Sequence, residues 1–459
     1  MKKMCLFMLV MAVFITSCQK DVICHCIPNN NNGLTVENSM TRSYEEALQI
    51  AEDAIDLLEG DQTRIRKHRT IKRNEGQIVT RAITRSGETR EEPVMYVFNN
   101  ENDEGFTIVS ADRSKQALIA VTEKGNYSYG TPTGIEPFDL YVEEIAAQLM
   151  SGFTPAPLPD VPSIPSIGGL CDTIYCNYSK VDAMLTTKWG QSGIYGNLCP
   201  NGLSGCSNTA AVQIMAYHKY PSLLFLTYLG VNDFTAITID WDNILCHDEG
   251  IGTYNSSLGK YVCNCGCNYE HISAIMREVG FRANTSYNFD DPSTPKNERG
   301  SGADELAIRN VFFILGFGNP VHVEGVTFED YQDVIYSNLD NKMPMYVSGF
   351  QSTGGGHAWV IDGYEHKSCR IDYYRDNPNY NPNDIYNLEP RYIYDFTYEN
   401  KSNLLHFNWG WDGSCDGWFA YGCFAPNDGQ DYDDDSELNH SIYNFDQWIN
   451  LVYNIQPNN

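Results

Sequence analysis

Hydrophobic patterns between residues 41 and 153 predict a small domain of mixed α and β structure. Residues 43–60 place apolar side chains on one helical face, and Ser43 with Glu46 forms a capping box at the start of this helix. Three runs alternate as half-buried strands do: 94–98, 105–110 and 118–122. A second helix is expected at 139–150. We therefore expect a small α/β domain ahead of the main domain.

Beyond residue 170 the pattern changes along the chain from helical to β-rich. Helical spacing predicts four helices, at 206–217, 269–280, 301–315 and 329–339. Short apolar runs then predict strands at 345–348, 358–364, 392–396, 404–409 and 418–419. Helices followed by strands favour an α+β domain with a helical part, a β-rich part and a cleft between them.

The first 17 residues have the layout of a bacterial signal peptide. Lys2 and Lys3 precede an apolar run that is too short to span a membrane. The following Ile-Thr-Ser-Cys sequence resembles a lipobox, which implies cleavage before Cys18 and lipid attachment to it. An ordinary signal peptide is the alternative. Residues 18–40 are polar and indicate a flexible tether.

A proline-rich stretch separates the two predicted domains. Five prolines between residues 155 and 165 indicate a stiff, exposed linker. An exposed linker of this kind is a preferred site of proteolytic cleavage. The expected divisions are a signal peptide at 1–17, a tether at 18–40, a small domain at 41–153, a linker at 154–170 and a larger domain at 171–459.

The charge of the chain excludes one class of function. A net charge of −28 argues against nucleic-acid binding, which needs a basic footprint, and fits a solvated, exported protein. Residues 61–90 are the exception, since they are rich in Arg and Lys and poor in apolar positions. We interpret them as an exposed loop, or as a surface that docks on an acidic partner domain.

The cysteines favour disulfides over a metal site. Cys263, Cys265 and Cys267 are spaced more closely than the paired ligands of most zinc sites. Besides Cys206, the expected catalytic domain has ten cysteines, which could all pair in an exported protein. An acidic run at 431–435 lacks the pattern of a calcium loop, so we expect a solvated loop there. We expect no cofactor and no metal.

Cys206 is the candidate nucleophile. It follows a Gly-containing loop and starts a predicted helix, where free backbone N–H groups and the helix dipole favour a thiolate. A small buried cysteine is the structural alternative. A Cys nucleophile needs a His to accept its proton, and His357 follows three glycines and precedes a predicted buried strand. Asn408 and Trp409 come after a further apolar run, and the order Cys, His, Asn, with about 150 residues between Cys and His, is the papain-type order.

Four motifs in this order resemble the streptopain family of papain-fold cysteine peptidases, in its Bacteroides-type lipoprotein form. They are K-W-G-Q at 188–191, G-C-x-x-T-A-x-x-Q-I-M-x-Y-H-x-Y-P from 205, G-H-A-x-V-I-D-G-Y from 356 and N-W-G-W-x-G from 408. The run G-F-T-I-V-S-A-D from residue 105 also resembles the prosegment of this family. The resemblance implies an inhibitory prosegment followed by a papain-like catalytic domain.

The resemblance also implies roles for individual residues. Cys206 would attack the scissile carbonyl and His357 would shuttle the proton. Gln191 would complete the oxyanion hole, and Gly356 would contact the substrate backbone. Ser301 is a looser match to another substrate-binding position. The family is described as steering its His with a Trp, which favours Trp409 over Asn408 for the third role.

Two other classes of protein remain open at this point. One is a catalytically dead papain fold that binds a partner, and the other is a Cys-dependent acyltransferase with the same dyad. The prosegment and the proline linker favour a protease, because an inhibitory prosegment prevents self-digestion. The expected partners are therefore protein or peptide substrates, the chain's own prosegment and, through a lipid anchor, a bacterial outer membrane.

Overall fold

The computed structural model describes most of the chain. The described residues are 41–59, 69–85, 88–113, 115–151, 173–230, 235–245, 250–264, 266–287, 301–350, 356–380, 390, 392–421 and 449–458. The predicted signal peptide, Cys18, tether, proline linker, Cys265 and acidic run lie outside these residues. The described residues form two compact units, a larger one within 41–151, 179–366 and 402–458 and a smaller one within 173–178 and 367–401.

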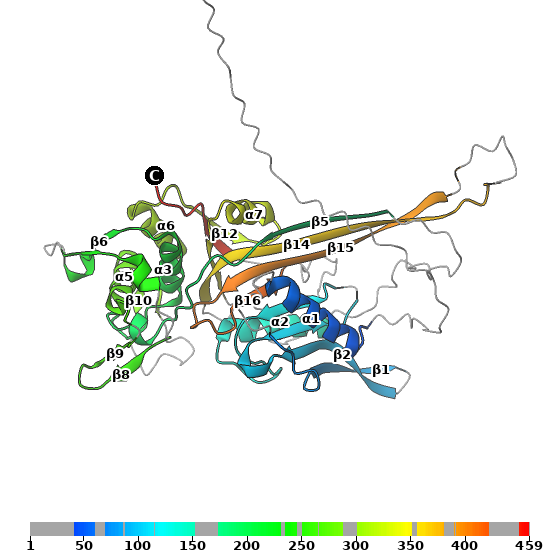
Figure 1. Cartoon of the computed structure of the whole chain (residues 1–459), viewed down its shortest axis with the longest axis horizontal. Helices are drawn as coiled ribbons and strands as arrows, with labels where there is room; N and C mark the ends of the chain where they lie inside the picture. The colour runs from blue at the N-terminus through cyan, green and yellow to red at the C-terminus, as the bar shows by residue number, and fades with distance from the viewer. Residues whose placement is uncertain are drawn as a thin grey trace, which may run out of the picture. The chain divides into compact units, whose positions relative to one another are not determined.

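The N-terminal part of the larger unit is a four-stranded antiparallel meander with a helix on each face (Figure 1). Its elements are α1 (Tyr44–Glu59), β1 (Gln77–Arg85), β2 (Glu88–Asn99), β3 (Phe106–Ser110), β4 (Leu118–Thr122) and α2 (Glu136–Ser151). Ala47 and Ile55 of α1 pack on one face, and Phe138 of α2 packs on the other. The predicted capping box is present, because Ser43 and Glu46 each accept the other's backbone N–H.

The interpretation of residues 61–90 as a loop is wrong for the described residues after 76. They form β1 and the start of β2, which pair antiparallel from Gln77 to Arg85 with a register shift between Val79 and Thr80. The arginines concealed the alternation of this segment, in which Val79 is buried and Ile78 is exposed. Arg81 lies opposite Glu92 on the neighbouring strand, so the charge of the basic strand is balanced within the hairpin.

The helical part of the catalytic region is built around α3 (Cys206–His218). This helix packs with α5 (Tyr269–Arg282) and α6 (Glu305–Ile314) around a core that includes Ile214 and Ile275 (Figure 1). The other helices described in this region are α4 (Trp241–Leu245), α7 (Gln332–Asp340) and the 3₁₀ turns η3 (Gly193–Tyr195) and η4 (Thr227–Leu229), while the turn η2 (Glu101–Asp103) lies between β2 and β3. Three small hairpins pair β6 (Leu223–Phe225) with β7 (Ala236–Thr238), β8 (Thr253–Asn255) with β9 (Lys260–Val262) and β10 (Ser286–Tyr287) with β11 (Ser301–Gly302).

The predicted helix at 301–315 starts later than expected. Ser301 lies in β11, and the helix begins at Glu305, where the Asp304 side chain accepts the Ala307 N–H as an N-cap. The other three predicted helices are confirmed within a few residues. Together with the strands, they confirm the α+β class.

The β-rich part supplies the strands beyond β4 to an eleven-stranded sheet among the described residues. Its strands outside the N-terminal meander are β5 (Thr173–Val181), β12 (Val321–Val326), β13 (Met345–Phe350), β14 (Gly356–Asp376), β15 (Tyr392–Asn408), β16 (Gly417–Ala420) and β17 (Ile449–Tyr453). The order is β1-β2-β3-β4-β16-β15-β14-β13-β17-β12, and β5 pairs with β14. The strands predicted at 392–396 and 404–409 are therefore one long strand, β15.

The N-terminal meander and the catalytic strands belong to the same sheet. Strand β4 pairs antiparallel with β16, with Ala120 opposite Phe419. Phe419 is fully buried and packs edge-on against Phe138 and Tyr141 of α2. The N-terminal region thus shares a hydrophobic core with the catalytic region, rather than packing as a separate unit.

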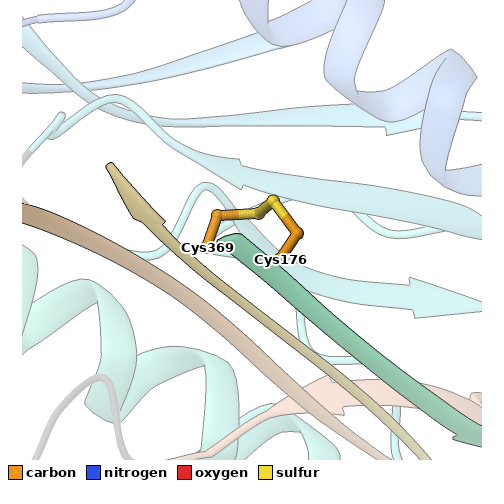
Figure 2. The surroundings of a disulfide bond; sticks show 2 residues. All are labelled: Cys176 and Cys369. Carbon is orange, nitrogen blue, oxygen red and sulfur yellow. A yellow bond between two sulfur atoms is a disulfide. The ribbon is translucent and has the colours of Figure 1, made fainter. Parts of the chain in front are cut away.

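The cysteines do not all pair. Cys176 of β5 and Cys369 of β14 form a disulfide (Figure 2), and Cys263 and Cys267 are also disulfide-bonded. Cys199 and Cys415 are free and buried, which contradicts the expectation that all ten cysteines besides Cys206 could pair. Each packs as a small apolar residue, and burial raises the pKa of Cys199 to about 11 and that of Cys415 to about 12. None of the helices in the described ranges has the length and apolar character needed to cross a membrane.

Candidate active site

Cys206 is the first residue of α3 and is partly buried. The preceding Gly205 has φ 92° and lies so close to Ser301 that a Cβ atom on it would be 2.4 Å from the Ser301 carbonyl oxygen. Only glycine fits this approach. Ser301 therefore lies beside the start of the nucleophile helix, with its hydroxyl bonded to Asn201.

His357 lies near the start of β14, beside this cysteine. The backbone N–H of Ala358 hydrogen-bonds the thiol of Cys206, so the thiol is adjacent to the residue that follows His357. Strand β14 is held in register by β13, where Gly349 is opposite His357 and Phe350 is opposite Gly356. Gly356 is exposed at the start of the strand. Two segments that are distant in sequence thus bring Cys206, His357, Gly356 and Ser301 together.

The ring of His357 is oriented by a main-chain group. Its Nε2 atom is 2.8 Å from the carbonyl oxygen of Trp409. The Trp411 indole N–H is 3.4 Å from the same nitrogen, a longer contact. Because a carbonyl can only accept, the shorter bond places the proton on Nε2 and leaves the lone pair on Nδ1. This is the tautomer in which Nδ1 can serve as a base.

Three tryptophans surround His357. The ring of Trp359 lies 6.4 Å away and nearly parallel, and the ring of Trp411 lies 6.0 Å away at 28°. The fully buried ring of Trp409 is 6.2 Å away and tilted by 37°. These rings exclude water from the imidazole, so the pair of Cys206 and His357 lies in a medium of low polarity.

Burial acts on both members of the pair. It raises the pKa of the Cys206 thiol, against the opposing effect of the Ala358 and Ser207 hydrogen bonds. It lowers the pKa of His357 to about 4, against the opposing effect of the Trp409 carbonyl. Each charge alone is therefore disfavoured, and proton transfer from one group to the other forms both charges together.

The hydrogen bonds of Asn408 in the described structure go to groups other than His357. Its Oδ1 atom accepts from Gln213 of α3 at 2.8 Å and from the N–H of Gly410 at 3.1 Å. Its Nδ2 atom donates to the carbonyl of Thr187 at 2.8 Å. The carboxamide of Asn408 thus ties the segment before Gln191 to α3 and to the turn after β15.

Gln191 has an unpaired donor. Its main-chain carbonyl accepts from Ser204, which fixes the segment against the loop before Cys206. Its side-chain Nε2 is buried and has no hydrogen-bond partner among the described residues. A buried amide N–H without a partner is costly, so this atom is available to a ligand oxygen at low additional cost.

A buried charge cluster near the site was not foreseen from the sequence. His406 of β15 bonds Asp362 of β14 at 2.6 Å and lies 3.4 Å from Glu123, which follows β4. Lys188 pairs with Glu123 at 2.9 Å. Burial alone would lower the pKa of His406, but Asp362 and Glu123 raise it to about 10. Burial alone would raise the pKa of Glu123, but His406 and Lys188 hold it below its usual range.

The described residues contain no group of three or more His, Cys, Asp or Glu side chains that could hold a metal ion. Cys263 and Cys267 are engaged in disulfides, so neither is available as a thiolate ligand.

Two family models match the chain. Residues 189–419, just over half of the chain, match the Peptidase C10 family. Residues 37–145 match the family described as Spi protease inhibitor. The first match includes Gln191, Cys206, His357 and Trp409, and the second covers most of the N-terminal meander.

Curated relatives agree with these families. Streptopain of Streptococcus pyogenes serotype M1 is 27% identical over 359 residues, covering 72% of this chain and 75% of its own length. The thiol protease/hemagglutinin PrtT of Porphyromonas gingivalis is 26% identical over 359 residues, covering 73% of this chain and 35% of its own length. Among solved structures, a fragment of Prevotella intermedia prointerpain A is 20% identical with a TM-score of 0.46, covering 83% of this chain and 100% of the fragment.

Proposed function

The chain belongs to the peptidase C10 family, and from this membership we propose that it is a cysteine endopeptidase made as a zymogen. Residues 41–153 are the inhibitory prosegment, and cleavage within the linker at 154–170 releases the catalytic domain at 171–459. The match of the N-terminal region to a protease-inhibitor family supports this order of parts.

One observation carries the assignment of the nucleophile. The thiol of Cys206 lies at the start of α3 and accepts the N–H of Ala358, next to an imidazole whose Nε2 is bonded to the Trp409 carbonyl. A thiol, a base beside it and a group that orients the base are the three parts of a nucleophilic dyad. A merely structural cysteine has no need of the second and third parts.

The reaction then follows in two stages. The sulfur of Cys206 forms a bond to the scissile carbonyl carbon while Nδ1 of His357 takes the thiol proton. The tetrahedral intermediate collapses by breaking the C–N bond, and His357 gives the proton to the leaving amine. Water, deprotonated by His357, hydrolyses the thioester, which releases the carboxylic acid and restores the thiol.

The oxyanion of the tetrahedral intermediate needs donors that are already in place. Gln191 Nε2, buried without a partner in the described structure, and the backbone N–H of Cys206 are the donors we assign. Gly356, exposed at the start of β14 next to His357, presents its main chain to the substrate. Ser301 lies against Gly205, the residue before Cys206, and is a second candidate for substrate contact.

The substrates are proteins or peptides, and we propose that the enzyme acts outside the cytoplasm. The N-terminal 17 residues would direct export, and lipid attachment to Cys18 would anchor the precursor to the outer membrane. The lipid site is tested by Cys18→Ala, which keeps the export signal. The precursor should partition with membranes in the wild type and become soluble in the variant; a wild-type protein found wholly in the soluble fraction excludes the anchor.

The function itself is tested with the full-length chain and its Cys206→Ala variant, incubated with a denatured protein such as casein. The wild type should cut itself within 154–170 and then hydrolyse casein, and iodoacetamide should abolish both reactions. The variant should remain uncut and inactive. Casein hydrolysis that survives Cys206→Ala would refute the assignment. New amide products with an added amine, in place of free carboxyl ends, would indicate an acyltransferase.

A further inference from the structure

The turn between β15 and β16 delivers both groups that touch Nε2 of His357. The Trp409 carbonyl accepts from Nε2 at 2.8 Å, and the Trp411 indole nitrogen lies 3.4 Å from the same atom. Yet the turn has an unfavourable backbone. Asp412 and Cys415 have φ of 54° and 57°, in the left-handed region where residues with a Cβ are disfavoured. Specific contacts must therefore hold it in shape.

The base of the turn is closed by a buried carboxylate. Asp416, just before β16, accepts the N–H of Trp409, just after β15, on its Oδ1 atom at 2.8 Å. Asp416 is only 2% exposed. A carboxylate is rarely buried so deeply unless a hydrogen-bond partner offsets the cost of removing it from water. Here the partner is the backbone N–H of Trp409, the residue whose carbonyl orients His357.

Few charges compensate for this burial. Burial raises the pKa of Asp416 to about 7, and the Trp409 N–H, His406 and Lys188 act in the opposite direction. The carboxylate of Glu123 raises the pKa of Asp416 further. Asp416 acts on the turn through the bond that its Oδ1 accepts from the Trp409 N–H, next to the carbonyl that orients His357.

We propose that Asp416 is a positioning residue for the peptidase reaction. By fixing the N–H of Trp409 it places the Trp409 carbonyl 2.8 Å from Nε2 of His357, which sets the tautomer and the plane of the ring. Asp416 touches neither the substrate nor the reacting atoms, and it acts through Trp409. This inference rests on the proposed function, because it assumes that His357 is the base.

The groups around His357 determine how its titration should respond. The thiol of Cys206, at the start of α3, is bonded to the N–H of Ala358, the residue that follows His357. Trp359 of β14 and Trp409 and Trp411 of the turn pack around the ring without titrating. The Trp409 carbonyl favours the protonated imidazole. Displacing this carbonyl should therefore move the bell-shaped pH dependence of kcat/KM towards lower pH.

The test compares Asp416→Ala with Asp416→Asn in the full-length chain after self-processing, with active sites counted by iodoacetamide. Asp416→Ala should lower kcat by about ten- to a hundredfold, leave KM unchanged and move the pH profile to lower pH. Asp416→Asn should restore kcat and the profile, because its Oδ1 still accepts. Asp416→Leu fills the space but offers no acceptor, so it should behave as Asp416→Ala does. It separates the loss of the acceptor from the effect of the cavity that alanine leaves. Ser414→Ala, in the same turn, is the matched control.

Three results would overturn the proposal. The first is wild-type kcat in Asp416→Ala or Asp416→Leu. The second is a loss in Asp416→Asn as large as in Asp416→Ala, which would make the charge and not the acceptor responsible. The third is a lower kcat with an unmoved pH profile, as a purely structural defect would give. Absence of Cys206-dependent hydrolysis in the wild type would instead refute the proposed function, so the two failures are distinguishable.

Discussion

The carbonyl oxygen of Trp409 lies 2.8 Å from Nε2 of His357, so the main chain of this tryptophan orients the imidazole. The Trp409 ring is fully buried among Phe407, Trp359 and Phe419 and is tilted relative to His357. The ring of Trp411 is only partly buried and stacks over His357. Replacing either tryptophan removes a ring but leaves the main-chain carbonyl, so the two substitutions should have different effects.

We predict that Trp409→Ala mainly costs stability and that Trp411→Ala mainly costs turnover. The first change empties a fully buried site and should destabilise the protein by about 3–5 kcal/mol. The second exposes His357 to water and should lower kcat with little change in stability. Thermal unfolding and kcat, measured on the same preparations, separate the two effects. A wild-type kcat in Trp411→Ala would contradict this division.

Gln191→Ala should remove one oxyanion donor and little else. The side-chain Nε2 has no partner to lose among the described residues, so stability should be nearly unchanged. Loss of one donor typically lowers kcat by about 10²–10³-fold. The rate at which iodoacetamide alkylates Cys206 should not change, because that reaction forms no oxyanion. A parallel fall in alkylation would mean that Gln191 supports the dyad rather than the intermediate.

The pH profile should be shifted towards acid relative to an exposed His. The active dyad carries one proton, shared between Cys206 and His357, so activity rises as the first proton leaves and falls as the second does. Burial lowers the pKa of His357 to about 4 and raises that of Cys206, which widens the range between these steps. We expect kcat/KM to be retained well below pH 6.5. An acid limb near that value would show that the imidazole is solvated in the active enzyme.

Local motifs in the sequence located the candidate site because each motif is contiguous. Cys206 at a helix start and His357 at a strand start are recognisable from their immediate neighbours, and the structure places the two segments together. The same reasoning found α1, α2 and the strands around Val97, whose apolar positions follow a regular period. These features depend on local pattern and needed no tertiary information.

The remaining features depend on contacts across the chain. Strand β15 is continuous through polar residues because Asn403 bonds Gln116 of the N-terminal region and His366 of β14. The role of Asp416 depends on a turn that brings it back to Trp409. The cluster of Glu123 and His406 exists because β4 pairs with β16, a register that no local pattern encodes. Such polar contacts are specified by tertiary structure.

This cluster gives a prediction about the prosegment. Glu123→Gln keeps the shape of the side chain but removes the carboxylate that pairs with Lys188 and His406. After cleavage of the linker, the N-terminal fragment should bind the catalytic domain at least about tenfold more weakly, as measured by the Kd of the nicked complex. Glu101→Gln, an exposed acid of the same region, is the control and should leave the Kd unchanged.

The two pKa shifts fix the sign of the pH dependence of this binding. Asp362 and Glu123 together raise the pKa of His406 to about 10, and only the part due to Glu123 belongs to binding of the fragment. Because this part raises the pKa, it favours binding at lower pH and is lost as the pH rises through about 10. Glu123 has a pKa below the ordinary 4.5, so its contribution is complete above pH 4.5 and is lost only as the pH falls through that lowered value. The wild-type fragment should therefore stay bound at mildly acidic pH, and its affinity for the catalytic domain should fall at strongly alkaline pH. The affinity of the Glu123→Gln fragment should fall much less over the same alkaline range. Release of the wild-type fragment between pH 4.5 and 6.5 would show that other groups govern the interface.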